Sequence, residues 1–204
     1  EGITFQCNTN VGVDIPIADL QQEFQAICLT GGSTVPRPLN IPGSELNGIH
    51  FAMDYLTQQN RMNTGSQSNL GAQISAKGKN VIILGGGDTG SDCLGTAHRQ
   101  GAASIYNFEL LPQPPESRDE NNPWPQWPLI MRSSHAHEEG GIRDYSILTK
   151  AFSGKDGNLT SLKACQIKMG NPDTNGRPVM EEIPGSEFEI PTELVLLAMG
   201  FLHP

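Results

Sequence analysis

The residues with the clearest chemical pattern lie between positions 80 and 94. An apolar run of strand length, residues 80–84, is followed by three consecutive glycines and then by a helical pattern. Gly85, Gly87 and Gly90 have the spacing G-x-G-x-x-G. Between a strand and a helix, this spacing is typical of a turn that holds the pyrophosphate of a dinucleotide. The alternative is a glycine turn that binds nothing.

Each glycine of this turn has an expected role. Gly85 permits the tight turn out of the strand, and Gly87 lacks the Cβ that would keep a pyrophosphate away from the backbone. Gly90 lets the helix pack closely on the sheet. Gly86 completes the loop. The N-terminus of the helix then offers free N–H groups and a partial positive charge, so we expect the phosphates to bind there.

Asp88 and Thr89 stand where the helix begins. Because a carboxylate repels a pyrophosphate, we expect Asp88 to cap the helix by accepting backbone N–H groups and to point away from the phosphates. The Thr89 hydroxyl either binds the cofactor or caps the helix as well. Met199 and Gly200 follow the last apolar run, and we expect them near the reactive ring, because ligands bind outside the carboxyl ends of strands.

The turn must be positioned by a strand before it and by a helix and a second strand after it. Residues 80–84, a helix ending near Gly101 and a strand at 104–110 span about 30 residues, as one βαβ unit should. We expect further strands at residues 3–7, 26–29, 146–152, 159–169, 178–183 and 193–200, and further helices at 16–24, 48–61 and 134–139. The order predicts the α/β class: a Rossmann-like dinucleotide-binding domain with a parallel sheet plus an antiparallel β-meander.

Two proline-rich stretches interrupt this pattern. Residues 35–43 contain three prolines, which favour extended chain, and we interpret them as a crossover between domains. Residues 112–128 contain six prolines and both tryptophans, so we expect a long loop without regular structure. Trp124 and Trp127 are interpreted as pinning this loop to its own domain, and contact with a partner is the alternative.

Composition excludes several classes of function. A net charge of −9 disfavours binding to nucleic acid or to an anionic membrane. No segment approaches the ~20 apolar residues of a membrane span. The four cysteines are scattered without a C-x-x-C pair, which is typical of buried, reduced thiols in a cytoplasmic protein. His135, His137 and the following glutamates lack a third separate ligand, so we expect a surface loop and no metal site.

Longer motifs resemble one known family. Residues 85–93 resemble the second nucleotide-binding motif of the glutamate synthase small (β) subunit, an FAD-dependent pyridine nucleotide oxidoreductase. The stretch Asn122-Pro123-Trp124-Pro125-Gln126-Trp127-Pro128 is similar to that subunit too. Residues 108–115, 182–190 and 194–201 extend the resemblance over essentially the whole chain. Related modules occur in dihydropyrimidine dehydrogenase and, more distantly, in thioredoxin reductase.

The resemblance implies a domain organisation. In that family an NAD(P)-binding domain interrupts an FAD-binding domain. Residues 1–45 would then be a partial FAD-domain segment and crossover, 46–192 the NAD(P)-binding domain, and 193–204 the return strand toward the FAD domain. The chain starts without Met and lacks both the first glycine motif and the cysteine clusters of iron–sulfur centres. We therefore expect the middle of a longer protein, inactive on its own.

The resemblance also implies the function. The module passes a hydride from NAD(P)H to FAD, and electrons continue through iron–sulfur centres to the large (α) subunit, which makes glutamate. The alternatives are the same module in a dihydropyrimidine dehydrogenase-like enzyme, or a non-catalytic nucleotide-binding domain. Hydride transfer between nicotinamide and flavin needs no protein acid or base, so no catalytic residue is expected.

The end of the second strand predicts which nicotinamide cofactor binds. An acidic residue there accepts hydrogen bonds from the 2′-hydroxyl of the adenosine ribose, whereas arginine accommodates the 2′-phosphate of NADPH. Glu109 holds this place, and Leu110-Leu111 stand where NADPH-using relatives are expected to have arginines. We therefore expect NADH, with NADPH as the alternative if Arg118 or Arg132 folds back from the loop.

Overall fold

A five-stranded parallel sheet forms the centre of the computed structural model, which describes residues 2–65, 73–173 and 178–203. Its strands lie in the order β2 (Ile49–Phe51), β10 (Leu194–Leu197), β3 (Asn80–Leu84), β4 (Ser104–Glu109) and β5 (Ile142–Tyr145). Every neighbouring pair is parallel. Strands β3 and β10 are buried almost throughout, as their continuous apolar runs require in a sheet covered on both faces.

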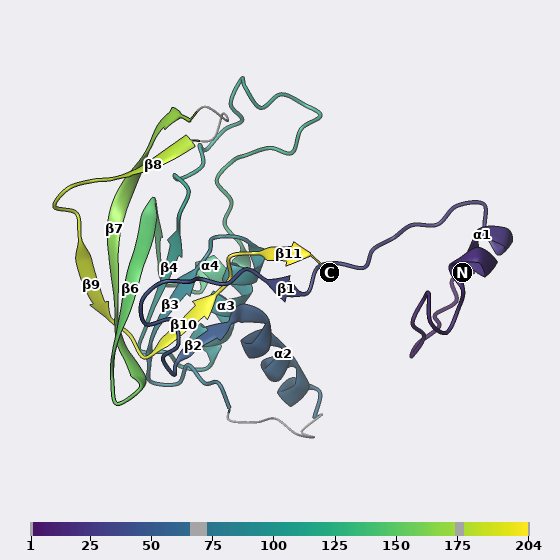
Figure 1. The fold of residues 1–204 in the computed structure, drawn as a ribbon, viewed down its shortest axis with the longest axis horizontal. Helices are drawn as coiled ribbons and strands as arrows, with labels where there is room; N and C mark the ends of the chain where they lie inside the picture. Colours follow the sequence, from purple (N-terminus) through teal and green to yellow (C-terminus); the bar gives the residue numbers. More distant parts are fainter. Residues whose placement is uncertain (1, 66–72, 174–177, 204) are drawn as a thin grey trace.

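Helices cover one face of this sheet. They are α2 (Ala52–Asn63), α3 (Asp88–Arg99) and the single turn α4 (His135–Glu138). The face of α3 that carries Cys93, Leu94 and Ala97 is fully buried and packs with the strands in one apolar cluster. Figure 1 shows these helices on the opposite side of the parallel sheet from the antiparallel strands. None of the helices in the described ranges is long and apolar enough to cross a membrane.

An antiparallel layer covers the other face. It consists of β6 (Ile147–Lys155), β7 (Asn158–Pro172) and β8 (Pro178–Glu182). The strand β9 (Phe188–Pro191) also pairs antiparallel with β7, along residues 161–164. Phe152 and Leu162 pack against Ile82 and Val195 of the parallel sheet in a second apolar cluster. The predicted fold class is therefore confirmed: an α/β domain with a parallel sheet and an antiparallel meander.

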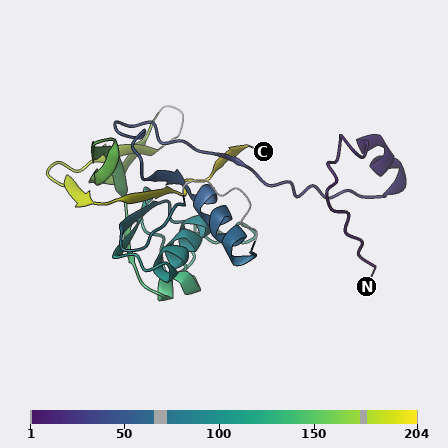
Figure 2. The same ribbon diagram turned by 90° about the horizontal axis from the view of Figure 1, so that it is seen from below.

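An N-terminal arm and a short ribbon lie outside the three layers. In the ribbon, β1 (Val35–Pro36) pairs antiparallel with β11 (Phe201–His203). The arm, residues 2–33, contains α1 (Ile17–Glu23) and no buried residue. It stands away from the body, by which we mean the three layers formed by the helices, the parallel sheet and the antiparallel strands, in both views (Figures 1 and 2).

The strands predicted at 3–7 and 26–29 are wrong. Both stretches are irregular and exposed, because no strand in the described parts of the chain pairs with them. Cys7 and Cys28 are exposed as well, whereas Cys93 and Cys165 are buried as expected.

The structure also contains several short strands that the sequence analysis did not predict. The segment predicted as the start of a helix at 48–61 forms β2 first, and β5, β9 and β11 were not predicted. Segments of three or four residues are too short to show a period, so only their pairing defines them. The predicted return segment 193–204 begins with β10, which lies inside the parallel sheet; of its strands, only β11 leaves the body.

Candidate functional site

The glycine turn joins β3 to α3 at the carboxyl end of the sheet. Gly85 has a φ of 118°, and a Cβ there would lie 2.2 Å from the carbonyl oxygen of Ala198. A Cβ on Gly90 would lie 2.1 Å from the carbonyl oxygen of Gly85. The expected tight turn and close packing of the helix are thus confirmed. Gly87 has an ordinary φ and open space where its Cβ would be.

Two side chains from β4 hold this turn from below. Asn107 is buried, and its Nδ2 donates to the carbonyl oxygens of Gly85 at 2.8 Å and Ile83 at 3.3 Å. Glu109 is half-buried at the strand end, and its Oε2 accepts the backbone N–H of Gly86 at 2.6 Å. Its Oε1 accepts the N–H of Leu111 at 3.1 Å. Each oxygen of Glu109 keeps a second lone pair with which to accept a further hydrogen bond.

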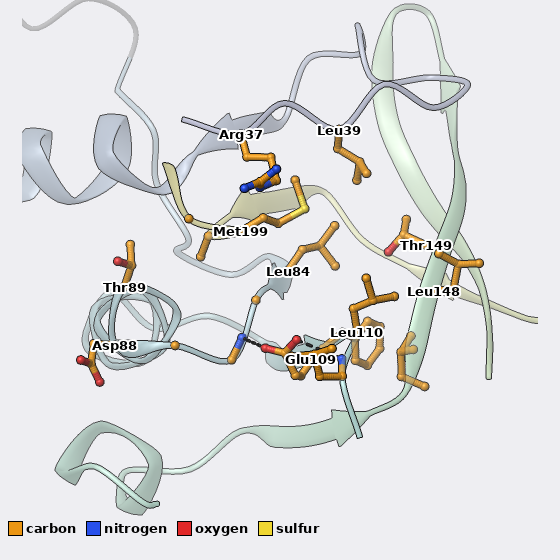
Figure 3. A pocket seen from close by; sticks show the side chains of 18 of the residues that line it. Arg37, Leu39, Leu84, Asp88, Thr89, Glu109, Leu110, Leu148, Thr149 and Met199 are labelled. Carbon is orange, nitrogen blue, oxygen red and sulfur yellow. Dashed lines mark hydrogen bonds between the residues drawn. The ribbon is translucent and has the colours of Figure 1, made fainter. Parts of the chain in front are cut away.

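The predicted cap by Asp88 is wrong. Gly87 occupies the N-cap position with extended backbone, and no side-chain hydrogen bond caps this helix. Asp88 is the first helical residue, from which a side chain does not reach the N–H groups that a cap residue satisfies. Its carboxylate does point away from Arg37 and Met199 in Figure 3, as expected of a group that avoids an anion. Thr89 lines the hollow above the turn, and its hydroxyl makes no hydrogen bond within the described structure.

These residues border a pocket of about 560 Å³, within the range of small-molecule and cofactor sites. Eight of the nine residues predicted for the site line this pocket: Gly85, Gly86, Gly87, Asp88, Thr89, Glu109, Met199 and Gly200. The ninth, Gly90, does not line the pocket and is buried in the first turn of α3. Met199, labelled in Figure 3, and Gly200 follow β10 and form one wall of the pocket. The antiparallel layer forms another wall of the pocket with Ile147, Leu148 and Thr149.

The sequence prediction missed several residues of this site. Asn107 could have been suspected, because an amide inside an apolar strand must find a buried partner. Arg37 comes from the crossover after β1, and its side chain reaches the pocket near Met199 (Figure 3). The walls from β1 and β6 are distant from the glycine turn in sequence, and only the packing of the layers brings them to it.

The loop that follows β4 keeps its arginines away from the pocket. Arg118 donates to the carbonyl oxygens of Asn122 at 2.9 Å and Gln126 at 3.1 Å. Arg132 donates to the carbonyl oxygen of Pro128 and lies 4.3 Å from the centre of the Trp127 ring. Neither arginine lines the pocket.

The two tryptophans do not pin this loop to the domain. Trp124 is 83% exposed and Trp127 is 72% exposed, so that interpretation is wrong. Buried Asn122 holds the loop from inside instead: its Oδ1 accepts the N–H of Leu129 at 2.8 Å, and its Nδ2 donates to the carbonyl oxygen of Trp127 at 3.0 Å. The loop therefore presents both rings to solvent.

The histidine pair lies at α4, where His137 has a capping role. Ser134 donates its backbone N–H to His137 Nδ1 at 3.1 Å, and its hydroxyl also contacts Ser91 of α3. Burial lowers the pKa of His137, and nearby Arg143 lowers it further. Below the glycine turn, burial raises the pKa of the Cys93 thiol to about 12, with Asp92 adding to the rise, so this thiol stays protonated.

Comparison with known proteins agrees with this geometry. No protein-family model matches the chain. It is 49% identical over 207 residues to the protein named glutamate synthase [NADPH] small chain of Mycobacterium tuberculosis, an alignment that covers 100% of this chain and 41% of the relative. The chain is homologous to the glutamate synthase small chain. It is also 45% identical over 213 residues to the glutamate synthase [NADH] of Schizosaccharomyces pombe, covering 100% of this chain and 10% of that protein.

The chain thus spans about two fifths of the small chains that it matches. Its fold is similar to that of FprA, an oxidoreductase of Mycobacterium tuberculosis whose structure revealed a covalent modification of NADP+. The TM-score is 0.59 at 15% identity, and the match covers 95% of this chain and 54% of FprA. At this identity the likeness concerns the fold alone.

Proposed function

We propose that the pocket binds NADH and that the protein is the nicotinamide-binding, electron-input part of a glutamate synthase. The observation that carries the proposal is the position of Glu109. Its carboxylate is bonded to the glycine turn and stands at the end of β4, where a Rossmann-type domain contacts the adenosine ribose. The family of the homologues and the shape of the pocket support the wider assignment.

The pocket suits a dinucleotide laid across the strand ends. Glu109, at the end of β4, would accept hydrogen bonds from the ribose hydroxyls. The turn from Gly86 to Gly90 would hold the pyrophosphate at the N-terminus of α3, with the open space above Gly87 as its seat. Met199 and Gly200, at the end of β10, would lie beside the nicotinamide.

Charge favours NADH over NADPH. The 2′-phosphate of NADPH would meet the Glu109 carboxylate, and Leu110 and Leu111 offer it no cation. Arg118 and Arg132 are engaged with carbonyl oxygens of their own loop. The names of the relatives divide between the two cofactors, since that of the Bacillus subtilis small chain also specifies NADPH while the Saccharomyces cerevisiae protein is named for NADH. The residues around the ribose site are therefore the better guide.

The rest of the reaction needs groups outside this chain. A bound nicotinamide supplies a hydride, and an FAD in a second domain would accept it, while the protein holds the two rings in register. The arm and the start of the crossover, within residues 1–45, and the segment after β10, within 193–204, would belong to that FAD-binding domain. Electrons would then pass through iron–sulfur centres to a large, glutamate-forming subunit, as the kinship with glutamate synthases suggests.

Titration of the protein with NADH and NADPH tests the choice of cofactor. We expect NADH to bind at least about 10-fold more tightly, because one uncompensated charge contact is worth that much. Glu109→Gln should reduce this preference, since the 2′-phosphate no longer meets a carboxylate. Glu120→Gln, which removes the same charge from the exposed loop, should leave the preference unchanged. Tighter binding of NADPH by the unmodified protein would contradict the NADH assignment.

Anaerobic addition of NADH to the flavin-loaded longer protein tests electron transfer. Bleaching of the flavin absorption band is expected if the domain feeds a hydride to FAD. An unchanged band, with NADH still bound, would instead favour a nucleotide-binding domain without turnover.

A further inference from the structure

The backbone of Arg37 is held at the edge of the pocket beside the β1–β11 ribbon. It directly follows β1, and its backbone N–H donates to the carbonyl oxygen of Gly200 at 3.0 Å. This bond joins the segment after β1 to the segment before β11, at the edge of the pocket. The side chain extends over Met199, on the side of the pocket opposite Glu109 (Figure 3).

The described residues offer the charge of this side chain no ionic partner. Arg37 is the only cationic residue among the described residues that line the pocket, whereas Asp88 and Glu109 are acidic. Its guanidinium makes no hydrogen bond or ion pair within the described parts of the chain. A dinucleotide brings two negative charges on its pyrophosphate into this hollow, and the N-terminus of α3 supplies only about half a positive charge.

We propose that Arg37 binds the pyrophosphate of the dinucleotide from the crossover side, opposite the glycine turn. This proposal rests on the proposed function, because it assigns a further ligand within the same site. The planar guanidinium suits the oxygens of a phosphate, which it contacts through paired N–H donors. A 2′-phosphate is not its ligand, since that group would lie at Glu109 on the other wall.

This contact would give the cofactor a second effect. The glycine turn belongs to the three-layer body, while Arg37 belongs to the β1–β11 ribbon. A pyrophosphate held by both would therefore tie the ribbon to the N-terminus of α3. Binding of the dinucleotide would stiffen the connection through which the chain enters and leaves the body.

Calorimetric titration of an Arg37→Gln variant tests the contact. We expect both NADH and ADP-ribose, which has the pyrophosphate but no nicotinamide, to bind at least about 10-fold more weakly than to the unmodified protein. Arg37→Lys, which keeps a charge but not the planar fork, should recover part of the loss. Arg61→Gln, in the last turn of α2 and away from the pocket, removes the same charge and should bind both ligands normally.

Three outcomes would overturn the proposal. Unchanged affinity of Arg37→Gln for ADP-ribose would show that the pyrophosphate is not its ligand. A loss for NADH but not for ADP-ribose would assign Arg37 to the nicotinamide, and a loss for NADPH alone would assign it to the 2′-phosphate. Failure of the unmodified protein to bind NADH or ADP-ribose at all is a different result, which would overturn the proposed function.

If Arg37→Gln does not fold, the proposal can still be tested by chemical modification of the unmodified protein. Phenylglyoxal modifies exposed guanidinium groups, and mass spectrometry reports the rate at each arginine. Saturating ADP-ribose should slow modification of Arg37 at least about 5-fold, as for a group that gains a charge-assisted contact, and leave Arg61 unaffected. Equal rates at Arg37 with and without ADP-ribose would overturn the proposal.

Discussion

Gly85, Gly87 and Gly90 share one sequence motif, but the structure gives them different reasons to lack a side chain. At Gly85 and Gly90 a Cβ would collide with backbone carbonyl oxygens, at 2.2 Å and 2.1 Å. At Gly87 a Cβ would meet nothing within the protein. The fold therefore requires Gly85 and Gly90 to lack a side chain. It sets no such requirement at Gly87, where the proposed pyrophosphate would lie.

Two alanine substitutions should separate these requirements. Gly90→Ala should lower the free energy of unfolding by about 1–3 kcal/mol, because α3 must move off the turn. Gly87→Ala should cost less than about 1 kcal/mol, the usual size of an N-cap effect, yet weaken NADH binding. Urea denaturation and NADH titration measure the two effects. Normal NADH binding by Gly87→Ala would contradict the role assigned to the open space.

At the residue scale, the sequence predicted the part of the site that is continuous in the chain. The glycine motif has a fixed spacing, and Glu109 stands at the end of the next strand, so both could be found without coordinates. Arg37 could not, because a lone arginine in a proline-rich linker has no pattern. Arg37 comes to line the pocket only when β11 returns beside β1.

At the scale of single elements, α4 depends on a neutral histidine. His137 Nδ1 accepts the N–H of Ser134, so the neutral ring must carry its proton on Nε2. That Nε2 is buried and has no hydrogen-bond partner among the described residues. Protonation would place a hydrogen on Nδ1 as well and break the contact that begins the helix.

The free energy of unfolding should therefore decrease as the pH is lowered. Burial lowers the pKa of His137 below its ordinary value of about 6.5. Its contribution to stability is thus complete above about pH 6.5 and is lost as the pH falls from there through the lowered folded-state pKa. Burial lowers the pKa of His50 too, which acts in the same direction.

Urea denaturation at pH 7.5 and pH 5.5 measures this effect. His137→Gln should lose less stability between the two values than the unmodified protein does. His135→Gln is the matched control, since that side chain is fully exposed. Identical pH dependence in His137→Gln and the unmodified protein would exclude His137 as a source of acid sensitivity.

The proline-rich loop is held by its polar interior and not by its aromatic residues. Asn122→Ala should leave the N–H of Leu129 without its acceptor and loosen residues 112–133. We expect limited proteolysis within this loop to become several-fold faster, since part-buried hydrogen bonds worth about 1 kcal/mol each are lost. Trp124→Ala, which removes an exposed ring, should be cleaved at the original rate. Equal rates for both variants would show that Asn122 does not hold the loop.

Element prediction succeeded where a segment determines its own structure. Strand β3 and helix α3 were predicted because a continuous apolar run that ends at glycines, followed by a helical period, reveals them. Strands β2 and β5 were not predicted, because three or four residues become a strand only when a neighbouring strand pairs with them. The apolar stretches 3–7 and 26–29 illustrate the converse, since they have strand-like composition but no partner among the described residues.

At the scale of the whole molecule, the arm and the body differ in burial. The arm exposes large apolar side chains, among them Phe5 at 85% and Leu29 at 88%, and buries none. Apolar surface of this kind belongs against another surface. In the proposed organisation that surface is the FAD-binding domain of the longer protein.

Removal of the arm should leave the body intact. A variant that lacks residues 1–32 should have a free energy of unfolding within about 0.5 kcal/mol of the original, because exposed residues contribute little. Its affinity for NADH should also be unchanged, since Arg37 is kept. A variant that lacks residues 1–45 loses Leu39 and Ile41, which pack on the second apolar cluster, and should be measurably less stable. A large loss of stability in the shorter deletion would show that the arm packs on the body.

The β1–β11 ribbon has one further consequence. Because Val35 lies opposite His203, the ends of the body are already together before any second domain forms. A host chain that carries the body as an insertion would have only a short gap to close, so the entropic cost to the host would depend little on the size of the insert. The body would then behave like a cassette, which is exchangeable between hosts at one hairpin-sized junction.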